Sequence, residues 1–207
     1  MAEHPFAPAA AMELIAAQER RTRTSFDGHL DQVLAAWGVA WLFGLGALWF
    51  QARGQSPYAG PQGWAPIVFA SLLAAAASLT AWRTVQTTRG VGGDSGYRGM
   101  LYGYGWLLGF AAYFGIMGAL AGAGASPAVL GVFGVVGPLL VTGLQYLVGA
   151  AILGARPMAA LGGWLIVLAA SIGFAGPVTA LVLGAVLGGG GFLATAAWVT
   201  LRRRRRG

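Results

Sequence analysis

The sequence predicts an all-α polytopic membrane protein with six transmembrane helices, a short N-terminal interfacial helix and both termini in the cytoplasm. Hydrophobic residues make up 57% of the 207 residues and charged residues only 9%, which is far from the averages of soluble proteins. Several apolar stretches approach or exceed the length that crosses a bilayer. The arginines between these stretches fall almost entirely on one side of the resulting topology.

The amino-acid composition narrows the kind of membrane protein and the kinds of site that it can carry. The chain has 35 glycines, which is usual where membrane helices pack closely. It has no cysteine, so disulfides, thiolate sites and iron–sulfur clusters are excluded. All 13 residues in the Lys and Arg count are arginines, and with the high alanine and glycine content this indicates a GC-rich bacterial genome. The net charge of +7 lies at the ends of the spans, which is typical of a membrane protein.

The first 29 residues are expected to form a cytoplasmic segment that contains one helix. Residues 9–26 are rich in alanine and become charged toward their end, where Arg20, Arg21 and Arg23 lie. Within the first 30 residues no apolar segment follows a basic N-terminus, so a cleaved signal peptide is not expected. We interpret the helix as lying on the membrane surface with its arginines near lipid phosphates; a solvated helix before the first span is the alternative.

Two polar loops separate the first three spans. One loop is rich in Gly, Pro and Ser, and the other is polar, basic and rich in glycine. Within a membrane domain of residues 30–201, we expect spans at about 30–52, 64–82 and 100–121, joined by loops at 53–63 and 83–99.

The second and third spans carry faces suited to helix packing. Small residues and a tryptophan share a face of the second span, and four aromatic residues form a stripe on the third. Beside the stripe lies Gly105-x-x-x-Gly109, and on another side Gly118-x-x-x-Gly122, a spacing that lets helices approach closely. The two faces are Ser71, Ala75, Ser78 and Trp82, and Tyr102, Trp106, Phe110 and Tyr113.

The fourth span, 128–153, is the most distinctive because it contains a proline and a side-chain amide. Pro138 has no N–H, so the carbonyl of Gly134 loses its usual helical partner. Two interpretations stay open for this face. It packs against neighbouring helices, which we favour, or Pro138, Thr142 and Gln145 line a path for a neutral or weakly polar solute. The whole face is Gly131, Gly134, Pro138, Thr142, Gln145 and Gly149.

Residues 158–201 carry no charge and are too many for one crossing. The turn between two spans could lie at 173–177 (GFAGP) or at 188–191 (GGGG). A turn at the glycine run would leave the last span too short. We therefore expect spans at about 159–174 and 178–200, followed by a basic cytoplasmic tail at 202–207.

With six spans, Arg53 is alone on one side of the membrane and every other arginine lies on the other. This asymmetry places both termini in the cytoplasm of a bacterial plasma membrane. Tryptophans should then mark the interfaces. We expect Trp37, Trp82, Trp164 and Trp198 at the inner one, and Trp49 and Trp64 at the outer one.

Side chains for catalysis or metal binding are scarce within the spans. His4 and His29 precede the first span, and no Asp or Glu is expected in a span interior. Without lysine there is no Walker A loop, and the arginine tail lacks the context of a nucleic-acid-binding site. We therefore expect a non-enzymatic protein with no catalytic, cofactor or metal site. The residues expected to anchor lipid phosphates are Arg20, Arg21, Arg23, Arg202, Arg203 and Arg204.

Three stretches carry a resemblance: WGVAWLFGLGALW (37–49), TRGVGG (88–93) and MLYGYGWLLGF (100–110). They resemble uncharacterised actinobacterial multi-pass membrane proteins, some of them encoded near small transcriptional regulators. The chain is more weakly similar to the membrane subunits of ABC-2-type exporters. These have six spans, cytoplasmic termini, an N-terminal interfacial helix and a loop after the second span that touches an ATPase. The chain departs from them in its glycine-rich 83–99 loop and in its short turn before the last span.

Two functional classes follow. The favoured one is a regulatory, scaffold or accessory membrane subunit; the alternative is a small permease or ABC-2-like transporter subunit for a neutral or weakly polar solute. The expected partners are anionic lipid headgroups, an ATPase or regulator at the 83–99 loop and N-terminal helix, and further copies of the chain through glycine-rich faces. Within that loop, Arg89, Asp94 and Arg98 could dock an anion or a partner, although a flexible loop is favoured. Nucleic acid is not expected.

Overall fold

The computed structural model describes residues 8–88 and 94–205; side chains are described for Met12 and from His29 onward, except at 87, 88, 94 and 95. Within these residues the chain is helical apart from short connections. α6, η1 and α7 follow one another without a break and form one rod. The elements are α1 (Pro8–Ala52), α2 (Trp64–Thr88), α3 (Asp94–Gly122), α4 (Pro127–Leu153), α5 (Arg156–Ile172), α6 (Pro177–Leu183), the π-helix η1 (Gly184–Gly189) and α7 (Gly190–Arg204).

Within the described part of the chain, five helical segments are long and apolar enough to cross a membrane. They are His29–Ala52, Trp64–Gln86, Gly96–Gly122, Pro127–Leu153 and Pro177–Arg204. α5 is apolar but only 17 residues long. At about 1.5 Å per residue, α5 is roughly 25 Å long, at the short end for a transmembrane helix. The all-α prediction is therefore confirmed, with five helices of spanning length and a sixth, shorter one.

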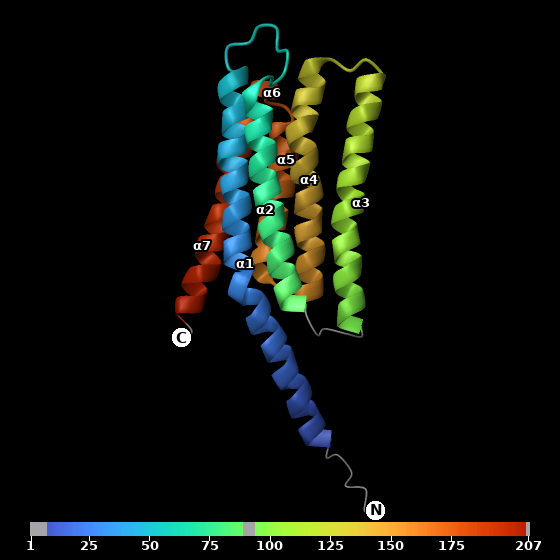
Figure 1. Cartoon of the computed structure of the whole chain (residues 1–207), viewed down its shortest axis with the longest axis vertical. Helices are drawn as coiled ribbons and strands as arrows, with labels where there is room; N and C mark the ends of the chain where they lie inside the picture. The colour runs from blue at the N-terminus through green and yellow to red at the C-terminus, as the bar shows by residue number, and fades with distance from the viewer. Residues whose placement is uncertain (1–7, 89–93, 206–207) are drawn as a thin grey trace, which may run out of the picture.

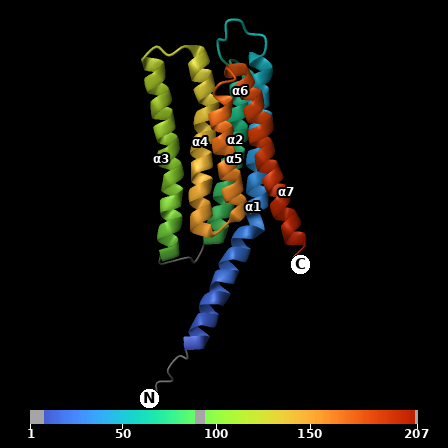
Figure 2. The same cartoon turned by 180° about the vertical axis from the view of Figure 1, so that it is seen from behind.

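The helices stand side by side and alternate in direction (Figure 1). The first half of α1 and the end of α7 lie at one end of the bundle, here called the terminal end, together with the turn between α4 and α5 (Figure 2). Residues 53–63, 123–126 and 173–176 connect helices at the opposite end, here called the loop end. Arg53 directly follows α1 and so lies at the loop end.

The core lies between α1, α4, α5 and the α6–η1–α7 rod. Leu34, Leu139, Leu165 and Phe192 are among its fully buried side chains. α2 packs mainly on α1 and lies in front of the core in Figure 1, and α3 packs mainly on α4 at the edge of the bundle. These two helices are called the flank helices below. Because each flank helix has one main partner, most of its surface is exposed.

Two helix crossings require glycine because backbone meets backbone. A Cβ added at Gly162 of α5 would lie 2.7 Å from the carbonyl oxygen of Gly143 in α4. A Cβ added at Gly189 of η1 would lie 2.7 Å from the backbone nitrogen of Leu42 in α1. No side-chain rotation can relieve such contacts. The glycines therefore allow α5 to pack directly on α4, and η1 on α1.

The last turn lies at residues 173–176, as the sequence predicted, and the glycine run lies inside the rod. Part of the run belongs to η1, where the helix widens to i→i+5 bonding. Nε1 of Trp164 in α5 donates to the carbonyl oxygen of Leu187 at 2.9 Å. Trp164 thus lies midway along α5, and its place at the inner interface stays a prediction. Its N–H has a backbone acceptor at that depth and needs no headgroup partner.

The loop predicted at 83–99 is wrong over most of its length. Residues 83–88 continue α2, and residues 94–99 belong to α3; residues 89–93 lie outside the described part. Polar composition marks where each helix leaves the apolar layer, and it does not mark where the helix ends. The two helices therefore extend beyond their apolar segments at the terminal end.

α1 is continuous from Pro8 to Ala52, which confirms the helix at 9–26 and joins it to the first span. Its first half extends beyond the terminal end of the bundle (Figure 1). The placement of this half on the membrane surface stays a prediction, and it would require a sharp bend relative to the bundle.

The packing face of α2 also differs from the one the sequence suggested. Ser71, Ala75, Ser78 and Trp82 are all exposed. α2 instead contacts α1 through the opposite side, where the indole Nε1 of Trp37 in α1 donates to Thr80 Oγ1 at 3.0 Å. This face, on which three of the four residues are small, thus has no partner among the described residues.

Candidate functional site

The polar face of α4 borders two different environments. Thr142 and Gln145 are buried, with exposed fractions of 4% and 9%, and Pro138 is half-buried. Gly131 and Gly134, one to two turns into α4, line a cavity at the loop end. The second half of the face therefore lies in helix packing, while the first half borders open volume.

Gln145 packs against the paired glycines of α3. A Cβ added at Gly105 would lie 2.7 Å from Nε2 of Gln145, and one added at Gly109 would lie 3.7 Å from the same atom. The Gly105-x-x-x-Gly109 pair therefore makes room for a side-chain amide. The sequence identified both features but gave no reason to join them.

The aromatic stripe of α3 is its docking face on α4. Trp106 meets Tyr146 edge to face with ring centroids 5.8 Å apart, and Tyr113 stacks on Phe133 at 5.4 Å. Tyr146 in turn meets Phe192 of α7 at 5.7 Å. Aromatic contacts thus run from the α3 flank through α4 into the core.

The limits of α4 follow from its sequence. Ser126 is the N-cap residue, and its Oγ accepts from the backbone nitrogen of Val129 at 3.4 Å. Pro127 occupies the first turn, where its missing N–H has no cost. Gly154 ends the helix with a φ of 64°, a conformation that side chains disfavour. The helix has the limits expected for the fourth span, 128–153, to within a residue.

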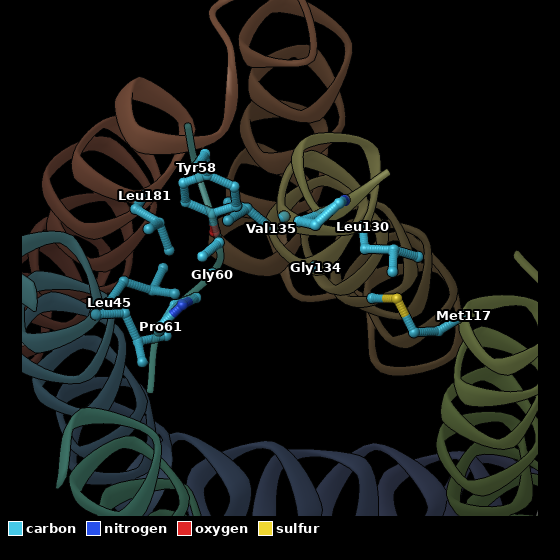
Figure 3. Close-up of a pocket in the computed structure, with 13 residues that line it drawn as sticks. Leu45, Tyr58, Gly60, Pro61, Met117, Leu130, Gly134, Val135 and Leu181 are labelled. Carbon is cyan, nitrogen blue, oxygen red and sulfur yellow. The ribbon is translucent and has the colours of Figure 1, made fainter. Parts of the chain in front are cut away.

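A cavity of about 400 Å³ lies at the loop end between α1, α4 and α6. Leu45, Leu130 and Leu181 contribute to its apolar wall, and Met117 of α3 closes one side (Figure 3). Residues 58–61 of the first loop cap it. Among the described residues that line this cavity, none is charged and none belongs to α2.

Tyr58 brings a polar group to the cavity. Its side chain rests on Gly131, where an added Cβ would lie 2.6 Å from the Tyr58 hydroxyl oxygen. Partial burial raises the pKa of Tyr58 above its usual range, so the side chain stays a neutral hydroxyl. The hydroxyl can therefore donate and accept hydrogen bonds at the edge of an apolar volume.

A buried carboxylate connects α1 to α7 at the terminal end. Asp31 is 7% exposed, and its Oδ2 accepts from Thr200 Oγ1 at 3.0 Å. The same oxygen lies 3.1 Å from Nη2 of Arg203, whose side chain is half exposed. Thr200 and Arg203 therefore compensate the carboxylate for its lost hydration.

A second polar contact lies beside this ion pair. Nη2 of Arg83 in α2 donates to Oε1 of Gln32 in α1 at 2.6 Å. The Arg83 guanidinium also lies 4.7 Å from the ring centre of Trp82. The terminal end of the bundle is thus held by polar contacts from both α2 and α7 to α1.

The arginines predicted to anchor lipid phosphates are not equivalent. Arg203 is engaged by Asp31, whereas Arg202 lies over the Trp198 ring at 4.6 Å and Arg204 is exposed. Lipid anchoring by Arg202 and Arg204 stays a prediction. The side chains of Arg20, Arg21 and Arg23 lie outside the described part of the structure.

Most of the residues that were predicted to dock an anion or a partner between α2 and α3 lie outside the described part of the structure. Arg89 and the side chain of Asp94 lie outside them, and only Arg98 is described, exposed near the start of α3. Docking at these residues stays a prediction. Among the side chains that are described, no three His, Cys, Asp or Glu residues gather as a metal site would require.

Sequence reasoning missed Asp31 and Tyr58. Asp31 was counted among carboxylates outside span interiors, yet it lies within the apolar segment His29–Ala52 and is buried. An acidic residue just inside the first span, in a chain whose last span ends in arginines, was the available signal. For Tyr58 the signal was an aromatic residue in an otherwise Gly-, Pro- and Ser-rich loop.

No family model, curated protein or solved structure matches the chain. What the chain does must therefore be inferred from its own residues and geometry.

Proposed function

We propose that the chain is a six-span integral protein of a bacterial plasma membrane, with both termini in the cytoplasm, and that it acts without catalysis as an accessory, scaffold or regulatory subunit. The alternating direction of the helices and the length of α5 support six crossings. The position of Arg53 at the loop end, opposite the C-terminal arginines, supports the orientation.

The exposure of the two flank helices is the observation that carries this role. On α3, a Cβ added at Gly103, Gly115 or Gly118 would meet no atom within 4 Å. On α2, Ser71 and Ser78 are exposed. Glycine disfavours a helix by about 1 kcal/mol relative to alanine and contributes nothing on an unpacked face. Small residues on such a face favour close contact with a helix of another subunit.

The terminal end offers the surface for a cytoplasmic partner. α2 and α3 extend beyond their apolar segments, and the first half of α1 extends beyond the bundle (Figure 1). The resemblance to actinobacterial membrane proteins encoded near regulators favours a regulator as this partner. The short connection at 173–176 leaves no re-entrant segment, which argues against an ABC-2 ATPase.

Photo-crosslinking tests the accessory role. The chain has no cysteine, so a benzophenone maleimide reports one introduced position at a time. Ser71→Cys places the probe on the exposed face of α2, and Ser171→Cys is a matched control on an exposed position of α5. We expect Ser71→Cys to give one discrete protein adduct in native membranes and Ser171→Cys to give none. An adduct at twice the chain mass would identify a homo-oligomer, and no adduct at Ser71 would contradict the role.

The orientation has its own test. An alkaline phosphatase fusion at Gly60 should be active because residues 53–63 face outward, and a fusion at Gly93 should be inactive. The reverse pattern would refute the proposed topology.

A small permease, or an ABC-2-like transporter subunit for a neutral or weakly polar solute, is the alternative. The cavity at the loop end favours it, because Gly131 and Gly134 line this cavity and belong to the same face of α4 as Pro138, Thr142 and Gln145. If this face lines a path, Gln145→Leu should impair movement of uncharged solutes while membrane yield stays unchanged. A fall in yield instead would assign Gln145 to packing against α3.

A further inference from the structure

The cavity at the loop end has apolar walls, and no side chain among the described residues fills it. Met117 reaches it from α3, and Leu45 and Pro61 lie on the opposite side (Figure 3). Leu181 lies on the same side as Leu45, and Tyr58 and Val135 lie between that side and Met117. An apolar volume of this kind gains free energy when a hydrocarbon occupies it.

We infer that this cavity binds one hydrocarbon chain of a neutral amphiphile, with the polar end of that molecule at the Tyr58 hydroxyl. This goes beyond the accessory role, because it assigns a ligand site that neither the flank helices nor the terminal end requires.

The volume fits one chain. A dry cavity of about 150 Å³ holds a molecule the size of benzene. On that scale, the volume of about 400 Å³ accommodates roughly 16 carbon atoms. This is close to one acyl or alkyl chain and too small for a two-chain lipid, whose remaining parts would lie outside.

The shape provides an entrance from the bilayer. The lining residues come from α1, α3, α4, α6 and the first loop, and none of those described belongs to α2. α2 packs mainly on α1 and α3 mainly on α4, so the flanks do not close over this side. A chain lying along the helices can therefore enter sideways.

The lining selects a neutral polar group. No charged side chain is among the described lining residues, so a carboxylate drawn into the cavity would stay unpaired at a large desolvation cost. The Tyr58 hydroxyl can bond an alcohol or ester oxygen instead. Gly131 allows this arrangement, because a Cβ there would collide with the Tyr58 ring and hydroxyl.

Two sources supply this chemistry: a bilayer glycerolipid and a free single-chain amphiphile. Native mass spectrometry of the full chain, in a sterol-based detergent that has no alkyl chain, separates them. The delipidated protein is titrated with 1-hexadecanol and, separately, with dioleoylphosphatidylcholine. Bound phospholipid identifies the bilayer as the source, and bound hexadecanol without phospholipid identifies a free amphiphile.

Gly134→Leu fills about a quarter of the cavity, because its side chain has four carbon atoms where the volume accommodates roughly 16. A Cβ at Gly134 meets only the terminal methyl of Met117 at 3.8 Å, so the rest of the side chain can enter the open volume. Gly118→Leu is the matched control, because a Cβ there meets nothing within 4 Å on the outside of α3. We expect occupancy to fall at least tenfold in Gly134→Leu and to stay within twofold of the original in Gly118→Leu.

Tyr58→Phe provides a second variant, which keeps the ring on Gly131 and removes the hydroxyl. Loss of one hydrogen bond should weaken hexadecanol binding about fivefold. Binding of neither probe to the original chain, or equal binding to Gly134→Leu, would overturn the site. Equal binding to Tyr58→Phe would overturn the placement of the polar end.

Discussion

The backbone crossing of α4 and α5 can be tested by one added methyl group. Gly162→Ala introduces a Cβ that would lie 2.7 Å from the Gly143 carbonyl oxygen and 2.9 Å from the Leu147 nitrogen. Both atoms are backbone, so only movement of the helices can relieve the contact. Gly163→Ala, one residue later in the same helix, adds a Cβ that meets nothing within 4 Å.

The difference in stability between these two variants measures the free-energy cost of a methyl group at the helix crossing. Each substitution gains about 1 kcal/mol of helix propensity, and this gain cancels in the comparison. Restoring ordinary contact requires α5 to move by about 0.7 Å, and a gap of that size forfeits a quarter to a half of the local van der Waals attraction. Overpacking of this kind costs about 1–3 kcal/mol. We therefore expect Gly162→Ala to be less stable than Gly163→Ala by about 1–3 kcal/mol.

Reversible unfolding in mixed detergent micelles, followed by circular dichroism as the fraction of dodecyl sulfate rises, measures the difference. The original chain and both variants are compared in the same micelles. Free energies of unfolding for the two variants that agree within about 0.5 kcal/mol would refute a glycine-dependent crossing.

Three further changes test other contacts by the same unfolding measurement. Arg203→Gln should lower the free energy of unfolding by about 1–2 kcal/mol, because it leaves Asp31 buried without its cation. A double-mutant cycle with Asp31→Asn should give a coupling energy of about 1 kcal/mol, and additive effects of the two substitutions would contradict the ion pair. Trp164→Phe should lower the free energy of unfolding by about 1 kcal/mol, because it removes the hydrogen bond to the π-helix; an unchanged free energy would contradict that hydrogen bond. Gly105→Val should displace Gln145 and loosen α3, seen as faster limited proteolysis near the α2–α3 connection; an unchanged pattern would show that α3 does not depend on this contact.

The sequence predicts the helices well where local chemistry sets their limits. Ser126, Pro127 and Gly154 bound α4, and the turn at 173–176 precedes a proline at the start of α6. The sequence mispredicts a helix end where the helix continues into polar residues. Residues 83–88 and 94–99 are polar because they leave the apolar layer, yet their backbone stays helical.

The candidate sites were harder to predict because they join distant residues. Asp31 and Thr200 are 169 positions apart, and no local pattern relates them. The glycines show the same limit. Gly162 lies against backbone, Gly118 lies in open space and Gly134 borders a cavity, although all three sit in similar Gly- and Ala-rich text. Composition shows that glycine is used for packing, and only the fold shows which glycine has which role.

The contact of α1 with η1 and α7 joins helices that are far apart in the order of synthesis. Ribosomes add about 5–20 residues per second, so residues 53–189 take on the order of ten seconds to synthesise after α1 is complete. During that interval Trp41 and Asp31 lack their partners from the final rod, whereas the α4–α5 hairpin can close as soon as it is inserted. α2 follows α1 directly and packs on it, so α1 has one helical partner throughout this interval. A chain truncated before the rod would keep that pair but would leave Asp31 without Thr200 and Arg203.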